Sequence, residues 1–163
     1  MNTPLPRWVV LWLALSTVVV IWDASFVLCR PLSFPGESLG FIWSFAYTIY
    51  LEVDHGYADL ENQFVSSLGI ISFVEAIVVA IALWAHTQAK HGLAHVLTLM
   101  ATLSTGTKTV LFFLFELLSG TPSIGHNEWI PVIMFWIIPN GIWIVVPYLI
   151  VALTSRRLIS ATA

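Results

Sequence analysis

Four long apolar runs follow one another along the chain, and each is long enough to cross a lipid bilayer. The runs are Trp8 to Leu28, Phe64 to Ala85, Leu93 to Leu118 and Trp129 to Leu153. A helix rises about 1.5 Å per residue, so about 20 apolar residues cross the roughly 30 Å of hydrocarbon in a bilayer. Hydrophobic residues make up 58% of the 163 residues, which is too apolar for a soluble domain of this length. We therefore predict an all-α fold, a bundle of four transmembrane helices that forms a single integral membrane domain over residues 1–163.

The connection between the first two runs predicts one further, shorter helix. Pro31 and Pro35 open this connection, and an aromatic run then extends from Gly40 to Tyr50. That run is too short to span a bilayer, so we expect a short interfacial or re-entrant helix that caps the bundle. The acidic stretch after it contains Glu52, Asp54, Asp59 and Glu61.

The positions of the basic residues predict which side of the membrane each terminus occupies. With four crossings, the two termini and the connection between the second and third runs share one side, which carries Arg7, Lys90, Arg156 and Arg157. The opposite side carries only Arg30. Because cytoplasmic loops are enriched in Lys and Arg, both termini are expected to be cytoplasmic.

The first run is interpreted as a retained helix rather than a cleaved signal peptide. Asp23 interrupts its apolar stretch, and Cys29-Arg30-Pro31 makes a poor cleavage site because these residues are not small. Cys29 is the only cysteine, which excludes an intrachain disulfide and a cysteine-rich metal site.

Four ionisable residues lie inside the apolar runs, although only 9% of the chain is charged. They are Asp23, Glu75, Lys108 and Glu116. A charge in hydrocarbon is costly, so such residues usually face the interior of a bundle or a wet cavity and mark a functional site. We therefore predict a functional site within the membrane.

Polar residues in the third run share one helical face. Thr98, Thr102, Thr105 and Thr109 follow at steps of four, three and four, and Glu116 continues the same stripe. Hydroxyls in such a stripe either contact a substrate or hydrogen-bond between helices.

The fourth run carries a face of large and polar side chains with the same spacing. This face contains Trp136, Asn140, Trp143 and Pro147, and Pro139 lies beside it. Proline lacks an N–H, so backbone carbonyls near it are left free. Trp143 lies in mid-span, away from the helix ends where tryptophans form interfacial belts. The faces of the third and fourth runs together suit the walls of a cavity.

Four short motifs occur in order along the chain. Asp23-Ala-Ser-Phe-Val-Leu28 ends the first run, and Tyr57-Ala58 lies eighteen residues before Glu75. Phe113-Leu114-Phe115-Glu116 ends the third run, and Asn140-x-x-Trp143-x-x-x-Pro147 lies in the fourth. Together they resemble the motifs of the emopamil-binding-protein family, which has the EXPERA fold and includes sterol Δ8-Δ7 isomerases and the sigma-2 receptor.

The resemblance implies a four-helix membrane bundle of the endoplasmic reticulum that acts on a sterol or binds one. The sterol isomerase has an additional first span, which the four runs do not include. It also has a histidine one turn before its first acid, where this chain has Val19. These departures argue against sterol isomerisation itself and favour a relative that acts on a terpenoid or meroterpenoid.

The chemistry of such an enzyme assigns roles to the intramembrane residues. Isomerising or cyclising an unactivated alkene needs a proton donor, a group that stabilises a carbocation and a base. Asp23 and Glu75 are the predicted catalytic acid and base, because two carboxyls in a dry site supply both proton transfers. Trp143 presents a π face that stabilises a cation by about 2 kcal/mol once water is excluded, and Asn140 is placed to orient a carboxyl or a substrate hydroxyl. Further candidates for the substrate site are Tyr57, Glu61, Lys108, Thr109 and Glu116. This chemistry requires no metal and no organic cofactor.

Several of these residues also have structural interpretations. In one of them, Asp23 and Glu75 pair with Lys108 and fix the helix register. A cation beside a carboxyl makes it a poor acid, so we favour pairing of Lys108 with Glu116, or extension of its ammonium to the membrane surface. Glu116 lies near a helix end and is expected at the interface, and packing is the alternative role for Trp143.

Residues near the membrane surfaces are expected to be solvated. His86, His91 and His95 lie around the connection between the second and third runs, but without carboxylates they are predicted to be surface groups rather than a metal site. Glu61 lies in the acidic stretch, where simple solvation is the alternative to a role in the site.

Three classes of function follow from these observations. The preferred one is a membrane-embedded isomerase or cyclase that protonates a sterol, terpenoid or meroterpenoid alkene and then deprotonates the carbocation. The alternative is a non-catalytic sterol- or lipid-binding protein, and the third class is an accessory membrane subunit without a ligand. The expected partners are a hydrophobic small molecule and the lipid bilayer, with no nucleic acid. The sequence leaves open whether two copies form a homodimer.

Overall fold

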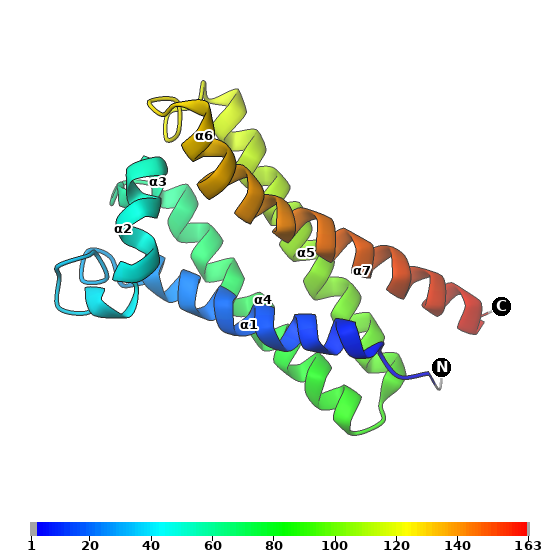
Figure 1. Cartoon of the computed structure of the whole chain (residues 1–163). Coiled ribbons are helices and arrows are strands. Elements are labelled where there is room, and N and C mark those ends of the chain that lie inside the picture. Colours follow the sequence, from blue (N-terminus) through cyan, green and yellow to red (C-terminus); the bar gives the residue numbers. More distant parts are fainter. Residues whose placement is uncertain (1–2, 163) are drawn as a thin grey trace.

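The computed structural model describes residues 3–162, and helices dominate it (Figure 1). Four helical segments are long and apolar enough to cross a membrane. The first three are α1 (Arg7–Leu28), α4 (Gln63–Thr87) and α5 (His91–Leu118). The fourth runs through α6 (Trp129–Pro131), a π-helical segment η2 (Val132–Ile137) and α7 (Ile138–Thr162). The predicted all-α bundle of four potential spans is confirmed.

The ends of the first three spans lie within two residues of the predicted ends. The fourth was predicted to end at Leu153, but the helix continues to Thr162. The extension contains neither glycine nor proline, so nothing in the local sequence stops the helix there.

The fourth span is irregular near its beginning. Pro139 has no N–H to donate to the preceding turn, and the backbone widens into the π-helical segment just before it. This widened turn carries Trp136, whose side chain is only 2% exposed. Such π-helical turns often accompany functional sites.

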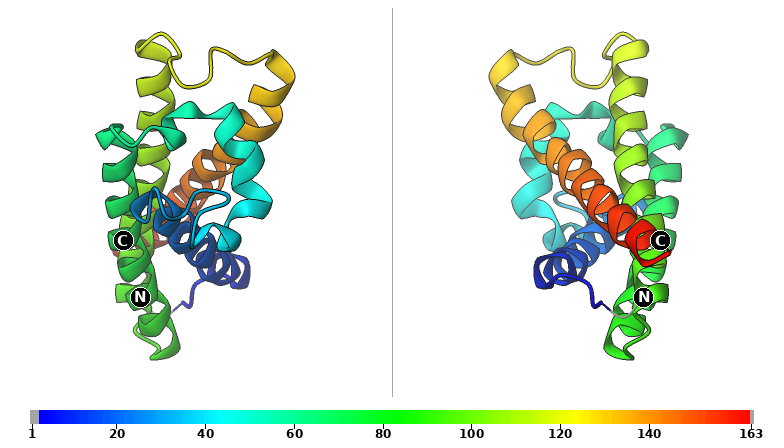
Figure 2. Two further views of the ribbon diagram at one scale, coloured as in Figure 1. Left: turned by 90° about the vertical axis from the view of Figure 1, so that its left-hand side faces the viewer. Right: turned by 90° about the vertical axis from the view of Figure 1, so that its right-hand side faces the viewer.

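The connection between α1 and α4 contains three short helices, which are η1 (Gly40–Ile42), α2 (Ser44–Val53) and α3 (His55–Ala58). The expected cap helix over Gly40 to Tyr50 therefore begins later and ends later than predicted. Trp43 anchors α2, because its Nε1 donates a hydrogen bond to the Trp22 carbonyl of α1 at 2.8 Å. The two side views show α2 between α1 and the start of the fourth span, where it contacts η2 (Figure 2).

Helix packing divides the interior into two apolar clusters. α5 packs against both α4 and α7, and α1 packs against α4. Near α2, the cluster is aromatic and contains Phe26, Trp43, Tyr47, Phe112 and Trp136. Toward the termini, the cluster is aliphatic and small, and contains Val9, Leu13, Ala85, Ala94 and Ala101. Both termini and the α4–α5 turn lie at this second end of the bundle (Figure 1).

Candidate functional site

A cavity of about 410 Å³ lies beside the aromatic cluster. Side chains from α1, α2, α3, α4, α5 and the fourth span contribute to its walls. Most of the lining is apolar or aromatic, and the polar lining residues are Asp23, Tyr47, Tyr50, Tyr57, Ser72, Thr105, Lys108, Thr109 and Asn140. A volume of this size is typical of sites for small organic ligands.

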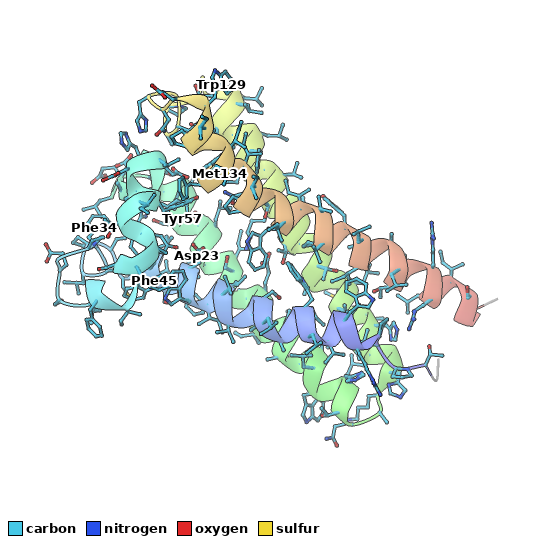
Figure 3. All side chains as sticks on the ribbon, in the orientation of Figure 1. Asp23, Phe34, Phe45, Tyr57, Trp129 and Met134 are labelled. Carbon is cyan, nitrogen blue, oxygen red and sulfur yellow. The ribbon has the colours of Figure 1, made fainter. Side chains whose placement is uncertain are left out.

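Asp23 lies near the end of α1, and tyrosine hydroxyls are its hydrogen-bond partners. Tyr47 of α2 donates a short hydrogen bond to its Oδ1, and Tyr57 of α3 donates one to its Oδ2 at 3.5 Å. The Tyr47 ring stacks on Phe26, one turn after Asp23, with ring centroids 3.6 Å apart. Figure 3 shows Asp23 and Tyr57 where α1 meets α2 and α3. The short helices α2 and α3, which we call the cap helices, therefore place hydrogen-bond donors against the Asp23 carboxyl of α1.

Three tyrosines of the cap remain protonated at neutral pH. Burial, followed by the charge of the Asp23 carboxyl, raises the pKa of Tyr47 and of Tyr57 well above the usual 10. Burial, followed by the charge of Asp54, does the same to the pKa of Tyr50. Their hydroxyls are thus available as hydrogen-bond donors at the cavity wall.

Asp54 is a second buried carboxyl in this region, and it belongs to the acidic stretch between the first two spans. It is 1% exposed. Its Oδ1 accepts the Gly56 N–H at 3.0 Å, and its Oδ2 accepts Trp136 Nε1 at 3.0 Å and the Tyr50 hydroxyl at 3.3 Å. Burial raises the pKa of Asp54 from 3.8 to about 6 against the opposing effect of these donors. One signal was present in the sequence, because a tryptophan on the inward face of a membrane span needs an acceptor for its N–H.

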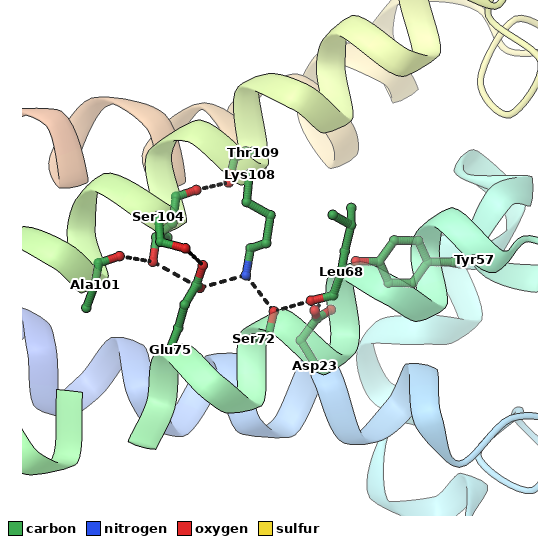
Figure 4. A network of polar contacts seen from close by, with 10 residues as sticks. Asp23, Tyr57, Leu68, Ser72, Glu75, Ala101, Ser104, Lys108 and Thr109 are labelled. Atoms are coloured by element: carbon green, nitrogen blue, oxygen red, sulfur yellow. Dashed lines mark hydrogen bonds and ion pairs between the residues drawn. The ribbon is translucent and has the colours of Figure 1, made fainter. Parts of the chain in front are cut away.

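Glu75 of α4 forms an ion pair with Lys108 of α5, with 2.7 Å between Oε2 and Nζ. Lys108 Nζ also donates to Ser72 Oγ at 2.6 Å, and the Glu75 carboxylate accepts from Ser104 at 2.7 Å and from Thr105 at 3.1 Å. Figure 4 shows this network between α4 and α5. Glu75 and Lys108 both lie in mid-span on antiparallel neighbours, and a buried cation is costly without a partner.

The network corrects two expectations about Lys108 and the two acids. Lys108 neither pairs with Glu116 nor extends to the membrane surface, because Glu75 is within reach inside the bundle. Asp23 and Glu75 do not share one cavity either. Asp23 lines the large cavity, whereas Glu75 lines a separate void of about 20 Å³ beside Trp143.

Two other acidic candidates lie away from the cavity lining. Glu116 lies near the end of α5 and is 3% exposed, and its Oε1 accepts hydrogen bonds from the N–H groups of Ser123 and Ile124 at 2.7 and 3.0 Å. It therefore fastens the loop after α5, where backbone donors would otherwise be unsatisfied. Glu61 is exposed in the turn before α4, and its backbone N–H donates to Asp59 Oδ1 at 2.9 Å.

The predicted faces of the third and fourth spans do contribute to the cavity wall. Thr109 and Asn140 line it, and Trp143 separates it from the small void. Asn140 is held in place because its Nδ2 donates to the Trp136 carbonyl at 2.8 Å. The Trp143 ring contacts Trp12 of α1, with centroids 5.5 Å apart. These side chains converge because α1, α5 and α7 surround one space.

The threonine stripe of α5 bonds mainly to its own helix. Thr102 and Thr109 donate to backbone carbonyls one turn earlier, at 2.7 and 2.9 Å. Thr105 alone of the stripe reaches another described helix through its hydroxyl, because it also donates to Glu75.

The three histidines near the α4–α5 turn differ in burial. His86 and His91 are half-buried, and His95 is fully buried, so the prediction of a surface group is wrong for His95. Its Nδ1 lies 2.8 Å from the His91 carbonyl of the same helix. Among residues 3–162, no group of three or more His, Cys, Asp or Glu side chains is placed to hold a metal ion.

No protein-family model and no curated protein sequence matches this chain.

Proposed function

We propose that this protein is a membrane-embedded isomerase or cyclase. In this proposal it protonates an alkene of a sterol or terpenoid, including meroterpenoids, and then removes a proton from the resulting carbocation. The substrate reaches the protein from the lipid bilayer, and the reaction uses no metal or organic cofactor. The proposal rests on the cavity and on the resemblance of the motifs to the emopamil-binding-protein family.

The position of Asp23 in the cavity wall is the main support for this proposal. Asp23 is the single carboxyl that the described residues contribute to the wall of a 410 Å³ cavity, and most of that wall is apolar. A carboxyl in such surroundings can carry a proton to an alkene, which itself has no groups for hydrogen bonding. Tyr47 and Tyr57 fix the carboxyl in position through their hydroxyls.

A carbocation in the cavity would be stabilised by Trp143 and would not meet an unpaired cation. Trp143 lines the wall and presents an aromatic ring, which attracts cations in dry surroundings. Lys108 is the one basic side chain in the described lining, and its charge is paired with Glu75. In this proposal Glu75 positions Lys108 rather than contacting the substrate.

The cellular setting is part of the same proposal. The motifs suggest the endoplasmic reticulum, and the distribution of Lys and Arg suggests cytoplasmic termini. The four potential spans fit a multi-pass membrane protein in either case.

Turnover in heavy water tests the proposed function. Purified protein is incubated in D₂O with a Δ8 sterol and with a farnesylated phenol, and products are analysed by mass spectrometry. We expect an isomer with one deuterium on carbon, and Asp23→Asn should lower the rate by roughly 10²- to 10⁴-fold because proton transfer is lost. Asp59→Asn is the matched control, since Asp59 is exposed. Equal rates in Asp23→Asn and wild type would rule out the proposed acid.

A non-catalytic sterol or lipid binder is the second candidate. The same cavity favours it, because Asp23 faces an apolar space and would pair with a cationic amphiphile. This candidate predicts saturable binding of the Δ8 sterol with no deuterated product. Binding that Asp23→Asn weakens, in the absence of any turnover, would favour the binder over the enzyme.

A further inference from the structure

We propose that Tyr50 and Asp54 together form the base that removes the proton from the carbocation. This inference rests on the proposed function and completes its proton balance. The carboxyl first expected as the base, Glu75, lies outside the large cavity and already accepts hydrogen bonds from Lys108, Ser104 and Thr105. A proton acceptor that faces the cavity must therefore come from another element.

Tyr50 is placed to be that acceptor. Its side chain lines the cavity, and its hydroxyl donates to Asp54 Oδ2 at 3.3 Å. The phenol oxygen can thus take a proton from the cavity side while its own proton passes to the carboxylate behind it. The Tyr50 ring packs edge-on against Tyr57, with ring centroids 5.0 Å apart, and Tyr57 in turn donates to Asp23. The proposed base and acid therefore face the same space.

Asp54 is held in one orientation by groups from three other positions in the fold. Trp136 Nε1 reaches its Oδ2 from the widened turn of the fourth span, and the Gly56 N–H reaches its Oδ1 from α3. A helix cap alone would explain the contact with Gly56. It does not explain why a buried indole and a phenol at the cavity wall both donate to the other oxygen.

In the proposed reaction, a proton enters the substrate from Asp23 and another leaves through Tyr50. Asp23 in its acid form gives its proton to one alkene carbon, and a carbocation forms on the other. A C–H bond beside the cation then breaks, its electron pair forms the new double bond, and its proton goes to the Tyr50 oxygen. The original hydroxyl proton of Tyr50 moves to Asp54 Oδ2. The enzyme ends with Asp23 ionised and Asp54 protonated, and exchange with water after product release restores both.

The electrostatic surroundings of Asp54 suit an acceptor near neutral pH. Tyr50 faces it from α2, Tyr57 from α3, Glu116 from α5 and Trp136 from the fourth span. Burial raises its pKa to about 6, and the charge of Glu116 acts in the same direction. Asp54 is thus mostly ionised at pH 7, yet it is a stronger base than an exposed aspartate.

Single-hydroxyl variants and pH profiles test the pair on the Δ8 sterol and the farnesylated phenol. Tyr50→Phe keeps the aromatic packing, and we expect it to lower turnover by roughly 100-fold or more. Tyr148→Phe is the matched control, since the Tyr148 hydroxyl contacts Thr107 and the residue does not line the cavity.

Wild-type turnover should rise as the pH increases through about 6, and Asp54→Asn should abolish that rise along with most of the activity. Full activity in Tyr50→Phe, with deuterium still incorporated, would overturn this inference and leave the proposed function intact.

A measurement without substrate separates the two proposals. Infrared titration of the carboxyl groups should show one that titrates near pH 6 and is missing in Asp54→Asn. Saturating dodecyltrimethylammonium places a fixed cation in the cavity, so the midpoint should fall by about one pH unit in wild type. Tyr148→Phe should show the same shift. An unchanged midpoint with the probe bound, as followed by tryptophan fluorescence, would show that Asp54 does not sense a cation there and would overturn the assignment.

Discussion

Asp23 and Glu75 are both carboxyls inside membrane-spanning helices, and their surroundings differ. Glu75 faces α5, where an ammonium and two hydroxyls occupy its oxygens. Asp23 faces the cap helices, where tyrosine hydroxyls bond to it and no cation forms an ion pair with it in the described structure. The comparison shows that a buried charge in a membrane helix can serve either helix packing or a cavity, and that the partner decides which.

Removing the cation that pairs with Glu75 should have the largest effect on the stability of the protein. We expect Lys108→Met to destabilise the fold by about 3–5 kcal/mol, because it leaves Glu75 buried and unpaired. The double variant with Glu75→Gln should recover much of that loss. Lys90→Met serves as the control, since Lys90 is exposed over Trp84. Reversible unfolding in mixed detergent micelles measures all four proteins, and a double variant as unstable as the single one would contradict the ion-pair account.

The pH dependence of stability tests the aromatic side of the comparison. Because burial raises the pKa of Asp54 above its unfolded value of 3.8, the folded state binds this proton more tightly than the unfolded chain does. The resulting stabilisation is complete below about pH 4 and is lost as the pH rises through about 6, by about 3 kcal/mol in total. Asp54→Asn should remove this component, and Asp59→Asn should retain it. Parallel stability curves for wild type and Asp54→Asn between pH 4 and pH 8 would refute this account.

The cation-stabilising role of Trp143 predicts a smaller effect. Trp143→Leu should weaken binding of dodecyltrimethylammonium about tenfold, because the aromatic face is lost while an apolar side chain remains. Trp84→Leu is the control, since Trp84 is half exposed and lies outside the cavity. Isothermal titration measures the affinity. An identical affinity in Trp143→Leu would leave Trp143 with a packing role alone.

The substitution Glu61→Gln is expected to have the smallest effect on stability and turnover. It is exposed and does not line the cavity, so Glu61→Gln should change stability by no more than about 0.5 kcal/mol and leave turnover unchanged. The same unfolding and heavy-water assays apply. A loss of activity of more than tenfold would return Glu61 to the site.

Among the site residues, positions within a single helix were predictable and partners between helices were not. Trp143, Asn140 and Thr109 were assigned to a cavity wall from helical spacing, and they line it. The spacing along α5 could not show that Lys108 meets Glu75, because that contact depends on the register between α4 and α5. Three residues at the site were missed for a related reason, since they reach it only through the short helices before α4: Tyr47, Tyr50 and Asp54. Trp136 was assigned to an inward face, but its contact with Asp54 could not be predicted.

Four apolar helices and the ends of the first three were predictable from the amino-acid sequence alone, because the length and composition of a run that can cross hydrocarbon are local properties. Helical spacing also shows which side chains share a face. The packing of the helices was needed to show that the Glu75 carboxylate is paired with a cation and that the Asp23 carboxyl faces the cavity. Coulombic and hydrogen-bond energies fall off over a few ångströms, so they depend on the packing distance between helices that are far apart in the chain.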